Sequence, residues 1–266
     1  MLRSVNDLYG YTVQATDGEI GSVDKFFFDD QTWTIRYLVV DTGTWLPGRQ
    51  VLISPISLIR TDWTAQRLYV ALTKEQIEKS PGIDTHKPVS RQREIEQLDY
   101  YGYPYYWYGT GLWGPAAYPA ALGVPTAMGY PDKMGIASGR AASGVERQAA
   151  PHKEQGDPHL RSTKEVIGYY IEAQDGEIGH VEDFIIDDKS WAIRYMIVDT
   201  VNWWPGKKVL IAPQWVEQVK WAESRVSVDL SREQIKNAPE YDPLALMSGD
   251  YEERLYAHYG RPKYFL

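Results

Sequence analysis

The sequence predicts an all-β protein: two small β-barrels in tandem, each with a short closing helix and an aromatic tail, joined by a flexible linker. Three observations lead to this fold class. The pentapeptide Asp-Gly-Glu-Ile-Gly occupies residues 17–21 and recurs, unchanged, at residues 175–179. Short apolar stretches with period-two alternation, separated by turn residues, are typical of small barrels. A segment rich in Gly, Ala and Pro separates the two copies and has no second copy of its own.

The repeat extends far beyond the pentapeptide. When residues 2–84 are aligned with residues 160–242 without a gap, 38 of the 83 positions are identical. A duplication of this extent indicates that one folding unit is made twice. The predicted organisation is barrel one (1–88), a helix and aromatic tail (89–108), the linker (109–158), barrel two (159–246) and a second aromatic tail (247–266).

Each repeat is expected to open with a helical turn and a strand. Ser4 stands three residues before Asp7, and Ser162 three before Glu165, which is the spacing of a capping box. Alternating apolar residues at 11–15 and 169–173 then predict a strand with one buried face. The Asp-Gly pairs of the repeated pentapeptide follow at once and predict a tight turn, because glycine accepts a positive φ and aspartate tolerates it.

The next strand is apolar on both faces. Successive strand residues point to opposite faces, so consecutive apolar residues need cover on the inside and on the outside of the barrel. The same holds for residues 38–40 and 196–198. We expect the sister repeat to supply the outer cover, and the predicted inter-barrel contact residues are Phe26, Phe27, Phe28, Phe184, Ile185 and Ile186.

Short strands and one short helix complete each predicted unit. Strands are expected at 49–54, 58–62 and 67–70 and at the matching positions of the second repeat. Thr73–Lys79 and Ser231–Asn237 begin with Thr-x-x-Gln and Ser-x-x-Gln capping boxes, so each predicts a short closing helix. Pro81 and Pro239 end these helices.

The tails are too aromatic to lie in water. Residues 100–107 read Tyr-Tyr-Gly-Tyr-Pro-Tyr-Tyr-Trp, after a predicted helix near residues 91–98. Such rings are expected to dock on the barrel, and the matching tail at 258–265 is expected to do the same. The composition of residues 109–158 predicts a disordered linker.

A loop with exposed apolar residues follows the strand that ends at Asp41. Large apolar residues beside cationic ones resemble a binding hot spot. The alternative is that the rings fold back onto their own barrel. The predicted partner-contact residues are Trp45, Leu46 and Arg49 in the first repeat and Trp203, Trp204 and Lys207 in the second.

Catalytic, metal-binding and cofactor-binding residues are not predicted. The acids Asp17, Glu19, Asp29 and Asp30 lack the spacing of a calcium loop, and turn formation accounts for them. None of the five histidines has a histidine at the matching position of the other repeat. Arg36 and Arg194 recur within an apolar strand, where we expect a structural ion pair with an acid such as Asp41 or Asp199.

Composition restricts the partners. The net charge is −8 without a basic block, which argues against general nucleic-acid binding. The absence of cysteine excludes disulfides and thiolate chemistry and suits a reducing compartment. With no apolar run of about eighteen residues, we expect no membrane span and a cytoplasmic location.

The residues of both repeats resemble the PRC-barrel family. The resemblance rests on Gly10-Tyr-Thr-Val, the pentapeptide at 17–21, Ile35–Asp41 and the stretch from Trp45 to Pro55, with the same pattern at 168–213. It implies a small all-β barrel like those of the photosynthetic reaction-centre H subunit and of the ribosome-maturation factor RimM. In those settings the barrel is similar to an adaptor that binds protein surfaces without performing chemistry.

The resulting functional hypothesis is a non-enzymatic protein-binding adaptor, with the two repeats packed as a pseudo-dimer within the chain. The resemblance leaves two alternatives: an RNA- or ribosome-associated factor like RimM, or an assembly role in photosynthesis like that of the H subunit. The chain lacks the separate amino-terminal domain of the former and the membrane helix of the latter. A hydrolase is disfavoured because no set of nucleophile, base and anion-stabilising groups is evident.

Overall fold

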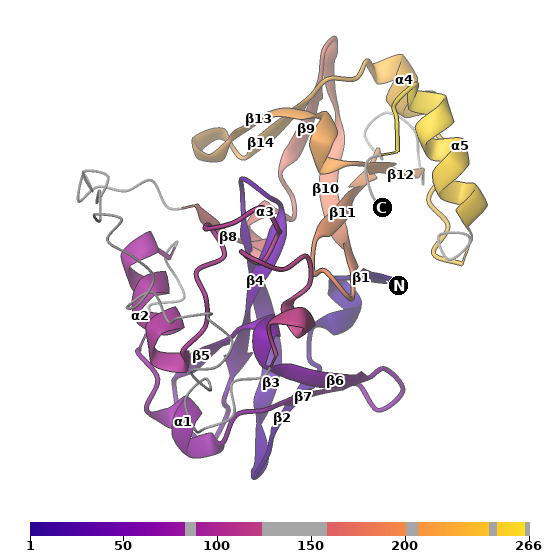
Figure 1. The fold of residues 1–266 in the computed structure, drawn as a ribbon. Helices are drawn as coiled ribbons and strands as arrows, with labels where there is room; N and C mark the ends of the chain where they lie inside the picture. The colour runs from indigo at the N-terminus through magenta and orange to yellow at the C-terminus, as the bar shows by residue number, and fades with distance from the viewer. Residues whose placement is uncertain (83–88, 124–158, 201–206, 245–248, 264–266) are drawn as a thin grey trace. The chain divides into compact units, whose positions relative to one another are not determined.

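The computed structural model describes residues 1–82, 89–123, 159–200, 207–244 and 249–263. Within these residues the chain forms two seven-stranded sheets with a few short helices (Figure 1), so the predicted all-β class is confirmed. Trp203 and Trp204, two of the predicted contact residues, lie outside the described residues.

The first repeat forms strands where short alternating stretches occur in the sequence. Its elements are β1 (Leu2–Ser4), η1 (Asn6–Leu8), β2 (Thr12–Ala15), β3 (Gly18–Asp29), β4 (Thr34–Asp41), β5 (Gln50–Ile53), η2 (Pro55–Ser57), β6 (Leu58–Asp62), β7 (Arg67–Val70), α1 (Lys74–Glu78) and α2 (Arg91–Tyr101). A further 3-10 helix, η3 (Pro119–Leu122), follows.

The second repeat reproduces this order. Its elements are β8 (Leu160–Ser162), α3 (Thr163–Val166), β9 (Tyr170–Ala173), β10 (Gly176–Asp187), β11 (Ile193–Asp199), β12 (Lys208–Ile211), η4 (Pro213–Trp215), β13 (Val216–Lys220), η5 (Trp221–Glu223), β14 (Arg225–Val228), α4 (Arg232–Asn237) and α5 (Gly249–Tyr259). Each strand matches its counterpart in the first repeat to within one residue after a shift of 158 positions.

The strand order turns each sheet back on itself. In the first repeat the order is β5-β4-β3-β2-β7-β6, and all pairs are antiparallel except β2 with β7. Strands β5 and β6, at opposite ends of this order, are joined by only Ser54–Ser57, which brings the two edges together as in a barrel. The second sheet has the equivalent order, β12-β11-β10-β9-β14-β13.

The repeated pentapeptide is a hairpin corner tied to the closing helix. Asp17 Oδ1 accepts a hydrogen bond of 2.8 Å from the backbone N–H of Lys74, the first residue of α1. Asp175 accepts the equivalent bond of 2.7 Å from Arg232 at the start of α4. Both helices carry the predicted capping box, with Thr73 and Ser231 as N-caps. The pentapeptide therefore turns the chain and also caps the helix that closes the unit.

The first strand of each repeat joins the sheet of the other repeat. Strand β8 pairs with β3 and strand β1 pairs with β10, both antiparallel. Each is only three residues long and lies where the sequence predicted a helical turn alone; that turn follows directly as η1 or α3. The two repeats therefore exchange their first strands.

Because of this exchange, the compact units of the structure differ from the two sequence repeats. The chain divides into unit A (Leu8–Ser162 and Lys189–Trp191) and unit B (Met1–Asp7, Thr163–Asp188 and Ala192–Leu266). The boundaries at residues 88 and 159 assumed that each repeat folds on itself. Backbone pairing instead transfers residues 1–7 to the unit of the second repeat, and β8 to that of the first.

The tails dock as predicted, and the described structure continues past the expected start of the linker. Helix α2 extends to Tyr101, and Tyr103 and Tyr106 are buried. In the second tail, α5 buries Tyr256 and Tyr259 against Trp215, with ring centres 5.5 and 4.5 Å apart. Residues 109–123, assigned to the linker from composition, include the buried Trp113. A buried indole therefore extends the ordered tail of unit A; residues 124–158 lie outside the described part.

Candidate functional site

The loop between β4 and β5 presents the predicted contact residues of the first repeat. Trp45 and Leu46 are half-buried, and Pro47 and Gly48 at its tip are exposed. The structure thus places an indole and a leucine side chain partly in solvent at one end of the barrel sheet. Such partly exposed apolar groups are a typical component of protein-binding surfaces.

Two sets of hydrogen bonds hold this loop at its base. The buried hydroxyl of Thr42 lies 2.8 Å from the carbonyl oxygen of Leu46 and 2.7 Å from that of Arg49. The backbone N–H of Trp45 donates to the carbonyl of Thr42 at 3.1 Å, and that of Arg49 donates to Leu46 at 3.0 Å. The loop conformation is therefore set by its own contacts before any partner binds.

The cationic residues of the loop act on the closing helices. Arg49 donates hydrogen bonds of 2.5 and 2.6 Å to the carbonyl oxygens of Glu78 and Ser80, at the carboxyl end of α1. Lys207, the matching residue of the second repeat, donates to the carbonyl of Lys236 in α4. A cation at this end of a helix satisfies its last carbonyls and opposes its dipole. This shared role was missed from the sequence, although the matching positions of a cation and a helix end were a usable signal.

The indole of Trp45 is shielded on one side by a lysine. The Lys74 ammonium lies 4.7 Å from the centre of the Trp45 ring, within range of a cation–π interaction. Because Lys74 begins α1, the ring rests against the closing helix rather than in the barrel core. The position of Trp45 is compatible with both alternatives from the sequence: contact with a partner, and packing against its own barrel.

The predicted inter-barrel residues are fully buried. Phe26, Phe27, Phe28, Phe184, Ile185 and Ile186 each have at most 2% of their surface exposed. Within unit A, Phe27 belongs to an apolar cluster with Tyr37, Val39, Leu52, Val89 and Leu160. The outer cover of this strand thus includes Leu160 from the exchanged strand and Val89 from the segment before α2. Direct packing of the two barrels through these six residues stays a prediction.

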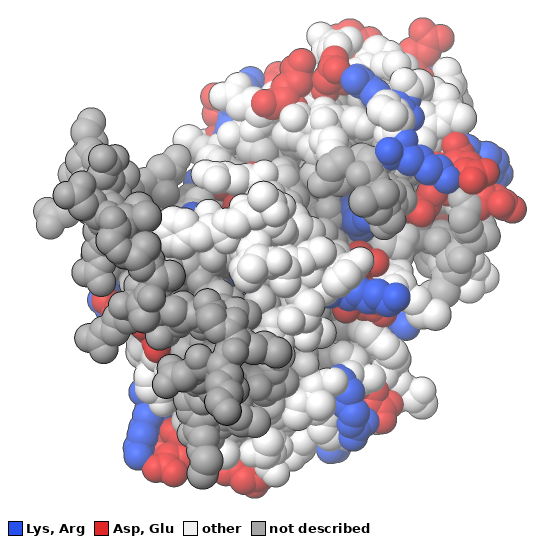
Figure 2. Space-filling model, viewed as in Figure 1, with Lys and Arg blue, Asp and Glu red and all other residues white. Residues whose placement is uncertain are grey.

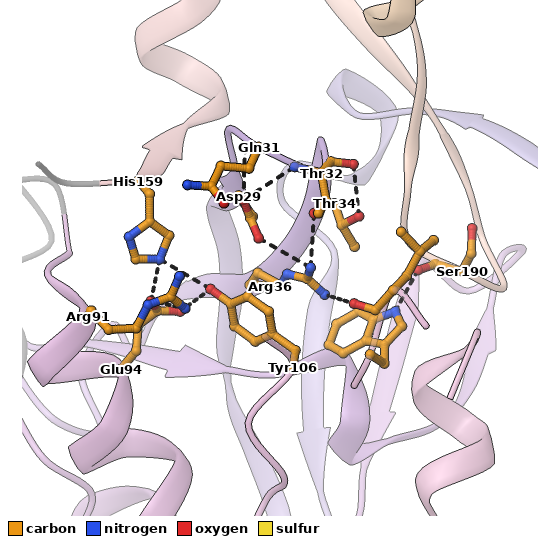
Figure 3. A network of polar contacts seen from close by, with 12 residues as sticks. Asp29, Gln31, Thr32, Thr34, Arg36, Arg91, Glu94, Tyr106, His159 and Ser190 are labelled. Carbon is orange, nitrogen blue, oxygen red and sulfur yellow. Dashed lines mark hydrogen bonds and ion pairs between the residues drawn. The ribbon is translucent and has the colours of Figure 1, made fainter. Parts of the chain in front are cut away.

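A network of buried charges lies beside this cluster in unit A (Figure 3). Arg36 is 1% exposed and its Nη2 atom lies 3.3 Å from Asp29 Oδ2 and 3.0 Å from the Thr32 hydroxyl. Its Nη1 atom donates to the carbonyl of Leu112 at 2.5 Å. Burial lowers the pKa of the Arg36 guanidinium. The expected ion pair therefore exists, but its acid is Asp29, seven residues before Arg36 across the hairpin, rather than Asp41.

Aromatic rings enclose the Arg36 guanidinium. Its central carbon lies 3.8 Å from the centre of the Tyr106 ring and 4.9 Å from that of Trp113. The indole N–H of Trp113 donates to the carbonyl of Ser190 at 2.8 Å. Tyr106 and Trp113 of the tail thus pack on β4 through the buried Arg36 guanidinium, and this contact favours the burial of both rings.

The second half of the network holds the exchanged strand. Glu94 of α2 is fully buried and lies 2.6 Å from His159 Nε2 and 3.3 Å from Arg91 Nη1. The Tyr106 hydroxyl donates to Glu94 at 2.5 Å, and burial raises the pKa of this phenol well above its usual value. His159 immediately precedes β8, and Arg161 within β8 pairs with Asp30 at 3.2 Å.

Among the residues that the structure describes, the second repeat shows only part of this network. Glu252 of α5, the counterpart of Glu94, accepts a hydrogen bond of 2.7 Å from the hydroxyl of Tyr195. Arg194, the counterpart of Arg36, is half-buried rather than buried. The histidine has no counterpart, because residue 159 aligns with Met1. Part of the asymmetry follows from the tail, since Leu112 and Trp113, which contact Arg36, come from a segment without a second copy.

The charged side chains of the network are almost fully buried. Those of Arg36, Asp29, Glu94 and His159 are 1%, 5%, 0% and 10% exposed, respectively. Their contacts join β4, the aromatic tail and the residue that precedes β8. Across the described part of the chain, three or more potential metal ligands do not gather at any one place.

Three of the repeated acids, Asp17, Asp29 and Asp30, have structural roles. Besides the helix-capping Asp17, Asp29 accepts backbone hydrogen bonds from Gln31 and Thr32 at 2.9 and 3.3 Å. Asp30 pairs with Arg161. Basic and acidic side chains lie close to one another on the face drawn in Figure 2, rather than in separate areas. Within the described ranges, no helix has the length and apolar composition required to cross a membrane.

Comparison with known protein families matches residues 2–76 to the family described as the PRC-barrel domain. The matched range begins with β1 and ends in the closing helix α1, so it includes strands β2 to β7 of the first sheet. The second repeat has the same strands in the same order, as expected of a tandem arrangement. A search of curated proteins found no match to the chain.

Proposed function

We propose that this chain, whose first repeat is a PRC-barrel domain, is a non-enzymatic adaptor that binds another protein through the loop between β4 and β5. The supporting observation is the Trp45 loop itself: a partly exposed indole, on a loop held in place by Thr42 and Arg49. The matching loop of the second repeat, with Trp203 and Trp204, is included in the proposal on sequence grounds.

The physical argument concerns the cost of ordering a binding surface. A loop that must become ordered on binding loses part of its interaction free energy, about 0.5–1.5 kcal/mol for each immobilised side chain. Here the backbone hydrogen bonds and the Lys74 contact already restrict the loop and the ring. A partly exposed tryptophan on such a loop is suited to fill an apolar pocket of a partner, and tryptophan is enriched among hot-spot residues.

The test is affinity purification from the native cell with the full chain carrying Trp45→Ala. Loss of a hot-spot tryptophan costs about 2 kcal/mol or more, so recovery of the partner should fall by about 30-fold. Trp63→Ala is the matched control, because Trp63 is also a half-buried tryptophan in a loop of unit A and packs on Tyr11, with ring centres 6.3 Å apart.

The same variants separate the binding role from a fold-back role. If Trp45→Ala lowers the melting temperature more than Trp63→Ala while partner recovery is unchanged, the ring belongs to its own barrel and the proposal fails. Trp203→Ala applies the test to the second loop. If the chain instead recovers ribosomal particles, and this recovery depends on RNA, the RNA-associated alternative is favoured.

A further inference from the structure

The two exchanged strands complete sheet edges that each repeat leaves open. Strand β3 is twelve residues long, but β2 pairs only with its first part, between Gly18 and Ser22. Strand β8 occupies the far part, with Ser162 opposite Phe27 and Leu160 opposite Asp29. In the second sheet, β9 likewise covers only the start of β10, and β1 covers Ile185–Asp187.

The donor strands carry the same sequence. Both β1 and β8 read Leu-Arg-Ser, and both pair with the same three positions of their acceptor strand, shifted by 158 residues. An open edge of a buried apolar strand exposes backbone N–H and C=O groups that require a partner. Each sheet is therefore built to receive a Leu-Arg-Ser strand that its own repeat does not supply.

Side-chain contacts in unit B hold the received strand in register. The buried Asp183 carboxylate accepts hydrogen bonds from the Ser4 hydroxyl at 2.5 Å and from the Asn6 backbone N–H at 3.1 Å. The backbone N–H of Val5 donates to the carbonyl of Phe184 at 2.9 Å. These contacts depend only on residues 4–6 and on β10, so the origin of the strand does not affect them.

The chain passes between the two units without a spacer. Residues 7 and 8 belong to different units, and so do residues 162 and 163. Short connections at an exchanged element favour exchange between copies, since a strand with the same contacts can come from another molecule.

We propose that the edge of β10 at Ile185–Asp187 is a strand-acceptor site that also takes the Leu-Arg-Ser strand at residues 2–4 of a second copy of this chain. The partner is the same protein because an identical copy reproduces each contact of Ser4, Val5 and Asn6. Within one chain the strand has an effective concentration on the order of 1 mM, so exchange between copies increases with protein concentration.

The chain has no cysteine, so introduced cysteines supply the only thiols in a disulfide test. Leu2 lies directly opposite Asp187 in the sheet, and neither is fully buried. Paired residues of antiparallel strands have Cα atoms about 4.5–5.5 Å apart, within the range that a disulfide spans. A chain with both Leu2→Cys and Asp187→Cys should form the link within one molecule, which verifies that the two positions react.

The experiment mixes two full chains with one cysteine each, Leu2→Cys in one and Asp187→Cys in the other. They are refolded together from urea at increasing concentration, oxidised, and separated by size without reductant. The matched control replaces Asp187→Cys by Glu177→Cys, which is also half-buried on β10 but pairs with Glu172 at its other end.

We expect a cross-linked heterodimer whose fraction rises with concentration, on the order of a few per cent at ~0.1 mM for an effective concentration near 1 mM. The control mixture should give less at every concentration. The proposal is overturned if the double-cysteine chain closes on itself but the mixture forms no more dimer than the control.

Discussion

Replacing Gly21 by alanine tests the close strand contact on which the barrel depends. Gly21 has φ +144°, and a Cβ atom built on it would lie 1.9 Å from the carbonyl oxygen of Asp41. Its counterpart Gly179 has φ +154° and would place Cβ 2.0 Å from the carbonyl oxygen of Asp199. The last glycine of the repeated pentapeptide is thus required where the backbone of β3 approaches the end of its partner strand β4.

The magnitude follows from the size of the overlap. The obstructing atom is backbone, within the paired strands that place Ser22 opposite Asp41, so it cannot rotate away as a side chain would. Strain at an unfavourable φ costs about 1–3 kcal/mol, and overpacking costs about 1–3 kcal/mol more. We therefore expect Gly21→Ala to destabilise unit A by about 2–6 kcal/mol, a large share of the 5–15 kcal/mol typical of a domain.

The assay is urea unfolding followed by tryptophan fluorescence, with Gly43→Ala as the matched control. Gly43 also has a positive φ, +56°, but a Cβ atom at this position would have nothing within 4 Å, so only the conformational cost of about 1–2 kcal/mol remains. With a slope of about 2 kcal/mol/M, the Gly21 variant should unfold at least ~1 M earlier than wild type. Equal losses in the two variants would refute the close-contact argument.

Three further predictions concern polar groups, of which Asp183, Arg36 and Asp29 are buried and Asp17 is exposed. Burial raises the pKa of the Asp183 carboxyl to about 6 from its usual 3.8, so ionisation of this carboxyl disfavours the folded state. The free energy of unfolding should therefore fall by about 3 kcal/mol as pH rises from about 4 to 6. Asp183→Asn should remove that decline from urea-unfolding curves measured across this pH range; an unchanged pH profile would contradict it. Arg36→Met leaves the buried Asp29 without its cation and should cost about 3–5 kcal/mol, whereas adding Asp29→Asn should recover part of the loss in a double-mutant cycle. Asp17→Ala removes the acceptor for the Lys74 N–H and should cost about 1 kcal/mol by thermal unfolding, while Glu19→Ala, at an exposed position of the same hairpin, should cost less.

Local elements were predictable because their causes lie close together in the sequence. The capping boxes at Thr73 and Ser231 begin helices where expected, since hydroxyl and amide are three residues apart in both the pattern and the structure. Strands β6 and β7 have the predicted bounds. The burial of Tyr103 and Tyr106 was predictable because the tail is rich in aromatic rings, whose exposure to water is unfavourable.

The candidate contact loop was predictable only in part. Its partly exposed Trp45 follows from apolar residues in a turn segment, but the role of Arg49 depends on the end of α1, about thirty residues further along the chain. The acid that pairs with Arg36 depends on hairpin register and on where the tail packs. Neither contact leaves a periodic signal in a single sequence.

The duplication, the positions of most strands and turns, and the two helices that close the sheets follow from the residues alone, because they depend on local backbone preferences and on the period of apolar residues. Only the folded chain shows which sheet receives each Leu-Arg-Ser strand and which acid neutralises Arg36. A three-residue strand has too little pattern to choose its neighbour. The choice is made by open backbone groups on β3 and β10, which lie more than a hundred residues away and require a partner.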